Sequence, residues 1–182
     1  MLETELKCMI TKDIYDNVKS EFNWDYTAEQ INYYYSDDAG ELKKHRIMVR
    51  VRVKNGISKL QIKQRKNPSS PLQICEEKEF DIDGAPEVIP PDTASEAIGI
   101  NVGSLRLIGS SKTLRSSLMW DASTEICLDM TEYFDTVDYE IEVEYKDALN
   151  SELADKLSKL GIEFKENSIG KFSRFMKRFE DT

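Results

Sequence analysis

The sequence is poor in the residues that mark thiolate or imidazole metal chemistry. It has three cysteines and one histidine among 182 residues, and Cys8, Cys75 and Cys127 form no CxxC or Cys/His pattern. Nothing in the chain therefore favours a zinc site. The odd number of cysteines also argues against a disulfide framework. We expect reduced cysteines in a cytoplasmic protein.

Long apolar runs and an excess of positive charge are also missing. No stretch approaches the roughly 18 apolar residues of a membrane span, and Met1–Glu5 lacks the basic start and apolar segment of a signal peptide. The formal net charge of −9 does not favour nucleic-acid backbones or anionic membranes. We therefore expect no DNA and no membrane partner, and the sequence leaves open whether the chain is a monomer or a homodimer.

The length and the apolar periodicity predict one α+β domain over residues 1–182. Thr11 is a good N-cap for an amphipathic helix at 12–22, and Gly161 is a good terminator for a helix at 148–160. A short helix is expected near 92–98, and the basic segment 169–179 is a candidate for a final helix. About eight strands in an antiparallel barrel or strongly curved sheet are expected, from segments at 3–10, 31–35, 46–54, 59–65, 73–80, 104–109, 112–120, 124–130 and 138–146.

Several strands carry long charged side chains at every second position. In one of them Arg50 and Arg52 alternate with valines, and Asn55-Gly56 then predicts a hairpin. For a single strand, the usual interpretation is a solvated outer face. Repetition over several strands favours a barrel whose interior carries the charges, with the valine stripe packed against helices outside. Similar alternation occurs at Lys63 and Arg65, at Glu77 and Glu79, and at Glu140, Glu142 and Glu144.

Buried charge is costly unless it is compensated, so acids, bases, a bound polyanion and a metal ion are expected together. Glu3 and Glu5 share one strand face, as do Glu140 and Glu142. Oxygen ligands point to Mg²⁺ or Mn²⁺. Phosphate oxygens would be held by the basic residues Arg50, Arg52, Lys63, Arg65, Arg115 and Lys171.

The first strand opens with Glu3-Thr4-Glu5-Leu6-Lys7, an ExExK pattern that alone is common in charged proteins. Further motifs follow in order: Asn32-Tyr33-Tyr34-Tyr35, Arg50-Val51-Arg52, Lys63 before a Pro-containing loop, Glu77-Lys78-Glu79, Thr113-Leu114-Arg115, Leu128-Asp129, Glu140-Ile141-Glu142 and Lys171-Phe172-Ser173-Arg174. This ordered set, which runs along nearly the whole chain at fitting spacings, resembles the CYTH family, also called triphosphate tunnel metalloenzymes.

The resemblance implies a closed eight-stranded antiparallel β-barrel that forms a tunnel with a polar interior and helices outside. Family members use Mg²⁺ or Mn²⁺ to hydrolyse inorganic triphosphate, thiamine triphosphate, or nucleotide and RNA ends, or to cyclise ATP. At matching positions the metal ligands would be Glu3, Glu5, Glu140 and Glu142, supported by Asp129 and Glu144. Phosphates would be held by Lys7, Arg50, Arg52, Lys63, Arg115 and Lys171.

Catalytic roles would fall to Lys7, Lys171 and Glu79, with Glu79 orienting a basic partner or a bound water. Class IV adenylate cyclases, which this chain also resembles, carry a His-Phe pair before the ExExK motif. This chain has Met1-Leu2 at that place. Many relatives also carry a lysine where this chain has Thr113, and Arg65 could replace that phosphate contact in part. We expect a triphosphate phosphohydrolase. An adenylate cyclase, a binding module that senses triphosphate or polyphosphate, and an ordinary β domain with a charged exterior are the alternatives.

Overall fold

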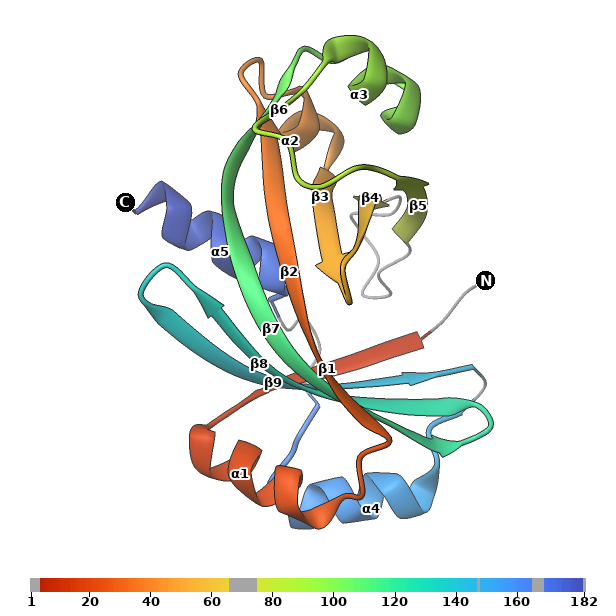
Figure 1. Ribbon diagram of the computed structural model, residues 1–182. Coiled ribbons are helices and arrows are strands. Elements are labelled where there is room, and N and C mark those ends of the chain that lie inside the picture. Colours follow the sequence, from red (N-terminus) through yellow and green to blue (C-terminus); the bar gives the residue numbers. More distant parts are fainter. Residues whose placement is uncertain (1–3, 66–74, 147, 165–168, 182) are drawn as a thin grey trace. The chain divides into compact units, whose positions relative to one another are not determined.

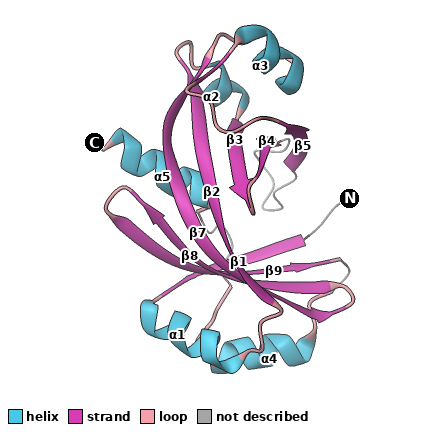
Figure 2. Ribbon diagram, viewed as in Figure 1, coloured by secondary structure: helices cyan, strands magenta, loops and turns pink. Residues whose placement is uncertain are grey.

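A computed structural model describes residues 4–65, 75–146, 148–164 and 169–181. Strands dominate this part of the chain, and helices are inserted between them (Figures 1 and 2). Their order is β1 (Thr4–Ile10), α1 (Lys12–Glu21), β2 (Tyr26–Asp37), α2 (Glu41–His45), β3 (Ile47–Lys54), β4 (Ile57–Arg65), β5 (Cys75–Asp81), β6 (Val88–Ile89), α3 (Pro91–Ile98), β7 (Leu105–Asp121), β8 (Thr124–Tyr133), β9 (Thr136–Tyr145), α4 (Ser151–Lys159) and α5 (Lys171–Glu180).

The strands form one sheet in the order β1-β9-β8-β7-β2-β3-β4-β5, with β6 paired to β7. Antiparallel ladders join β1 to β9, β9 to β8, β2 to β3, β3 to β4 and β4 to β5. The predicted α+β fold on an antiparallel sheet is therefore confirmed, with nine strands among the described residues. β1 and β5 stand at the two ends of this order, and closure of the sheet into a barrel stays a prediction.

The chain divides into two compact units. The terminal unit combines Met1–Glu29 with Thr113–Thr182, and the central unit is Gln30–Lys112. The expectation of a single domain over residues 1–182 stays a prediction. Among the described residues, no helix combines the length and the apolar composition that crossing a membrane requires.

In the terminal unit, α1 and α4 cover one face of the β8–β9 pair, and α5 lies on its other side (Figure 1). Thr11 caps α1 by accepting a hydrogen bond from the Ile14 amide at 3.3 Å, and Gly161, at φ 80°, follows α4 as expected. The final helix is also confirmed as α5. The core under α1 and α4 is built from Tyr15, Val18, Phe22, Ile126, Leu128, Ile141, Val143, Leu153, Leu157 and Ile162.

In the central unit, the valine face of β3 is buried against α3. Val49 and Val51 are 1% and 0% exposed and share a cluster with Ala94, Ala97 and Ile98 of the helix. The prediction that this stripe packs on a helix is therefore confirmed. Because side chains alternate across a strand, Arg50 and Arg52 lie on the opposite face of β3.

Several boundaries differ from the sequence-based expectation. The segments predicted as two strands at 104–109 and 112–120 form the single strand β7, in which Gly109, at φ 147°, lies within the strand. β2 is also longer than the predicted 31–35. The helix α2 was missed because it is short and is capped by a side chain before it: Asp37 accepts from the Glu41 and Leu42 amides at 2.7 and 2.9 Å. The two-residue strand β6 was missed because it is very short and prolines flank it at positions 86, 90 and 91.

Leu153→Ala tests the packing of α4. Leu153 is 0% exposed in the terminal core, so truncation should lower the free energy of unfolding by about 2–5 kcal/mol. The same change at the half-buried Leu160 should cost clearly less. Urea unfolding followed by circular dichroism measures both, and equal losses would contradict the burial of Leu153.

Candidate functional site

The terminal unit buries a group of carboxylates on the face of β8 and β9 opposite to α1 and α4. Asp129, Glu140 and Glu142 are 0%, 2% and 6% exposed. The antiparallel register pairs Asp129 with Glu140, and it pairs Glu142 and Glu144 of β9 with Lys7 and Glu5 of β1. In this unit, the interpretation of a charged solvated exterior is therefore wrong.

Lys171, the first residue of α5, supplies the central positive charge. Its Nζ lies 2.5 Å from Glu142 Oε1 and 2.9 Å from Asp129 Oδ2, and it also contacts Glu140. Burial lowers the pKa of Lys171, but Glu142, Asp129 and Glu140 together outweigh burial and raise it above its ordinary value. Lys171 is therefore a permanent ammonium ion at neutral pH.

Arg115 of β7 holds the same acids from a second direction. Its Nε and Nη2 donate to the two Asp129 oxygens at 2.8 and 2.6 Å, and Nη2 also contacts Glu142 Oε2. Burial raises the pKa of the Glu142 carboxyl, but Lys171 and Arg115 more than offset this effect and hold it well below its usual range. At Glu140 burial dominates, assisted by the adjacent Glu142, and raises the pKa.

A second carboxylate group lies beside the first and shares Glu142 with it. Oxygen atoms of Glu5, Glu142 and Glu144 all lie within 4.8 Å of one another. Burial, followed by the charges of Glu142 and Glu5, raises the pKa of Glu144 to about 7. These three carboxylates offer oxygen ligands and repel one another, so a hard divalent cation such as Mg²⁺ or Mn²⁺ would fit between them. Lys7 donates to Glu5 Oε1 at 3.0 Å at the rim of this group.

The predicted ligands therefore separate into two kinds. Asp129 and Glu140 lie within 4.8 Å of Glu142 as well, but ammonium and guanidinium groups already contact them. Glu5, Glu142 and Glu144 form the group that fits a metal ion. Glu3 lies outside the described residues, and so does the side chain of Arg65.

The central unit carries cations and acids in rows across its strands. Lys63 Nζ lies 2.7 Å from Glu77 Oε1, its direct partner on β5. Arg50 donates through Nε to Gln61, which donates to Glu79. These side chains line a small pocket of about 90 Å³, together with Met48, Ile62 and Lys78.

Three residues that sequence reasoning did not assign to the site contact its charged groups. Arg174 donates through Nε to Asp138 at 2.7 Å, and its Nη1 lies 2.7 Å from Glu140 Oε2. Asn32 and Gln61 accept from Arg52 and Arg50. The hairpin contained a signal for Gln61, because a two-residue loop at Asn55-Gly56 pairs Arg50 with Gln61.

Other candidate residues have structural roles. Thr113 is buried and shares a hydrogen bond with Thr131 at 3.0 Å, so it does not replace a lysine. His45 lies in α2 with its Nε2 3.3 Å from Glu41 Oε2, and it is exposed on the surface. Trp24 and Trp120 both pack against Phe22, with ring centroids at 5.7 and 6.1 Å.

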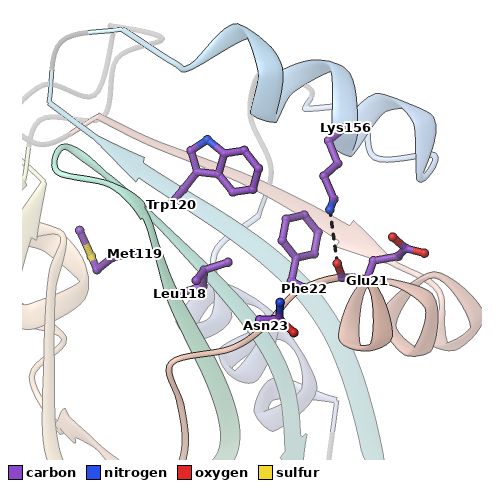
Figure 3. Close-up of a pocket in the computed structure, with 7 residues that line it drawn as sticks. All are labelled: Glu21, Phe22, Asn23, Leu118, Met119, Trp120 and Lys156. Atoms are coloured by element: carbon purple, nitrogen blue, oxygen red, sulfur yellow. Dashed lines mark hydrogen bonds between the residues drawn. The ribbon is translucent and has the colours of Figure 1, made fainter.

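Trp120 and Phe22 also line a cavity of about 240 Å³ near the end of α1 (Figure 3). Lys156 of α4 reaches over it and donates to the Glu21 carbonyl at 3.3 Å. Phe22 and Trp120 belong to the apolar cluster under α1 and α4. The buried carboxylates lie on the opposite face of β9, so this cavity is separate from them.

Comparisons with known proteins identify the family. The sequence model of the CYTH domain matches residues 1–176. YjbK of Bacillus subtilis (strain 168), named as a candidate triphosphatase, is 29% identical over 152 residues, which cover 80% of this chain and 78% of YjbK.

Solved structures agree in fold. HpAC1 from Hippeastrum, described as a candidate adenylyl cyclase with a dominant triphosphatase activity, superposes with a TM-score of 0.73 at 22% identity, covering 97% of this chain and 96% of HpAC1. A candidate adenylate cyclase from Bacillus halodurans gives a TM-score of 0.70 at 22% identity, covering 96% of this chain and 97% of its own. The chain belongs to the CYTH domain family.

Proposed function

We propose that this protein is a divalent-metal-dependent phosphohydrolase that acts on inorganic triphosphate or on a triphosphorylated small molecule. The proposal rests on one observation: in a chain of the CYTH family, carboxylate oxygens of Glu5, Glu142 and Glu144 all lie within 4.8 Å of one another. The triphosphatase activity described for HpAC1 supports it. Cytoplasmic location and the exclusion of DNA and membrane partners stay predictions.

Glu5, Glu142 and Glu144 are the residues that would hold Mg²⁺ or Mn²⁺. A divalent cation bound to a triphosphate neutralises the charge that develops during phosphoryl transfer. Asp129 and Glu140, which Arg115, Lys171 and Arg174 contact, orient these cations. We therefore assign Asp129 and Glu140 as positioning residues.

The basic residues hold phosphate oxygens. Lys171 and Arg115 have raised pKa values, because the surrounding carboxylates outweigh burial, so both act as fixed cations and neither acts as a base. In the proposal Lys7, Arg50, Arg52 and Lys63 also bind phosphate, and the forked guanidinium groups suit bidentate contact with its oxygens.

Hydrolysis of tripolyphosphate is the direct test. Purified protein with Mg²⁺ or Mn²⁺ should release phosphate, and Glu5→Gln should lower kcat by about 100-fold or more, because the carboxylate group loses a charged ligand. Glu132→Gln, at an exposed position of β8, is the matched control and should retain activity. A malachite-green assay measures release.

Three outcomes would contradict the proposal. One is the absence of release from tripolyphosphate, thiamine triphosphate and every nucleoside triphosphate. Another is the formation of cyclic AMP and pyrophosphate from ATP, which would establish the cyclase, the class named for the Bacillus halodurans relative. The third is tight binding without turnover that Glu140→Gln leaves unchanged, which would establish a sensor.

The pKa of Glu144 predicts how stability depends on pH in metal-free protein. The folded pKa is raised from 4.5 to about 7, so the folded state binds this proton more tightly than the unfolded state. The corresponding stability is fully present below pH 4.5 and is lost as pH rises through 7. Urea midpoints in EDTA between pH 5 and 8 should fall with pH in wild type, and should fall less steeply in Glu144→Gln.

Addition of Mg²⁺ gives the complementary measurement. A cation beside Glu5, Glu142 and Glu144 relieves the repulsion that raises the Glu144 pKa, so Mg²⁺ should raise the unfolding midpoint more at pH 8 than at pH 5. Glu132→Gln should behave as wild type. If the urea midpoint falls equally steeply with pH in wild type and in Glu144→Gln, the raised pKa of Glu144 is refuted.

A further inference from the structure

The arginines of β3 each donate Nε–H to a neutral amide oxygen. Arg52 Nε lies 2.9 Å from Asn32 Oδ1, and Arg50 Nε lies 2.8 Å from Gln61 Oε1. Both acceptors are the direct cross-strand partners of the arginines, Asn32 on β2 and Gln61 on β4. The sheet register therefore fixes both pairs.

An amide acceptor fixes a guanidinium without changing its charge. Asn32 is only 1% exposed, and a carboxylate of the same size at that place would put a full negative charge at hydrogen-bond distance from Arg52. A carboxylate adds direct charge–charge attraction to the hydrogen bond, so it competes with an incoming anion for the guanidinium. An amide orients the plane of the arginine and adds no negative charge to that of Glu77, which interacts electrostatically with both Arg50 and Arg52.

Gln61 has a second contact that neither a carboxylate nor an ammonium group could make together with the first. Its Oε1 accepts from Arg50 while its Nε2 donates to Glu79 Oε2 at 2.7 Å. An ionised glutamate has no donor for Glu79, and a lysine has no acceptor for Arg50. The Gln61 side chain therefore lies between Arg50 and Glu79 and hydrogen-bonds to both.

We propose that Asn32 and Gln61 are positioning residues that set the affinity for triphosphate, by orienting Arg52 and Arg50 with neutral acceptors. The inference rests on the proposed function in so far as these arginines bind phosphate. Acidic residues at either position would retain the hydrogen bond to arginine and weaken phosphate binding.

Asn32→Asp separates this role from a purely structural one. The variant exchanges an amide for an isosteric carboxylate beside Arg52, so the fold should be retained and the melting temperature should stay equal or rise. The Kd for tripolyphosphate, measured by calorimetry in EDTA, should rise at least tenfold. With Mg²⁺, KM should rise by a similar factor while kcat changes less than threefold.

Asn55→Asp is the matched control. Asn55 lies in the β3–β4 turn at φ 52°, where aspartate is tolerated, and the substitution adds the same charge next to β3, the strand that carries Arg52. Its Kd and KM should remain those of wild type. An equal loss of affinity in Asn55→Asp would attribute the effect to net charge and overturn the inference.

The pair at Gln61 and Glu79 offers an exchange test. Gln61→Glu alone places two carboxylates together, so it should lower both stability and affinity. The double variant Gln61→Glu/Glu79→Gln restores one donor and one acceptor at unchanged net charge, but the negative charge now faces Arg50. Melting temperature should recover and tripolyphosphate affinity should stay at least tenfold weakened; recovery of both would overturn the inference.

The proposed function and the inference fail separately. If the wild-type protein hydrolyses tripolyphosphate but Asn32→Asp binds it with the wild-type Kd, the inference is overturned and the proposed phosphohydrolase activity is retained. Binding of tripolyphosphate without turnover, weakened tenfold by Asn32→Asp, supports the inference and overturns the hydrolase. Absence of both binding and turnover in wild type overturns both.

Discussion

The contact of the Lys171 ammonium with Asp129, Glu140 and Glu142 is the constraint on which the terminal unit depends. Carboxylates this deeply buried are tolerated only with hydrogen-bonded cations, because an unpaired buried charge costs several kcal/mol. Lys171 is the first residue of α5, so compensation of the acids also fixes this helix. Phe175, one turn later, stacks on Phe134 with ring centroids 5.0 Å apart. Charge balance and helix packing therefore stabilise each other.

The same constraint explains why the acids divide into two groups. Lys171 and Arg115 already satisfy the oxygens of Asp129, so this carboxylate gains little from a further cation. Glu144 differs, since its nearest influences are burial and the negative charges of Glu142 and Glu5. Glu142 belongs to both groups and contacts both cations. A metal ion held by Glu5, Glu142 and Glu144 would thus be linked electrostatically to Lys171 through one shared carboxylate.

Sequence periodicity predicted the elements whose two faces differ strongly. The alternation of valine and arginine in β3 gave its orientation, and the Asn55-Gly56 turn gave the register to β4. The pattern failed at Gly109, which lies within the continuous strand β7. It also failed at α2, which at five residues is too short to show helical periodicity. The residues of the charged groups were predicted by the alternation and the family resemblance together. Their division into a carboxylate group that fits a metal ion and a group paired with cations was not predicted, because it depends on distances between strands that are far apart in sequence.

Arg174, Asn32 and Gln61 were missed for a related reason. Polar residues on a charged strand face carry no distinctive spacing, and their importance arises only from the group that each one touches. The chemistry of the acceptor then decides its effect on an anion site. Arg174 forms ion pairs with the carboxylates of Asp138 and Glu140, which balance its positive charge. Arg50 and Arg52 are oriented through Nε by amides, which add no charge. Cations that stabilise buried acids and cations that attract phosphate both need fixed positions. A neutral acceptor fixes a guanidinium without adding a negative charge that would compete with the anion.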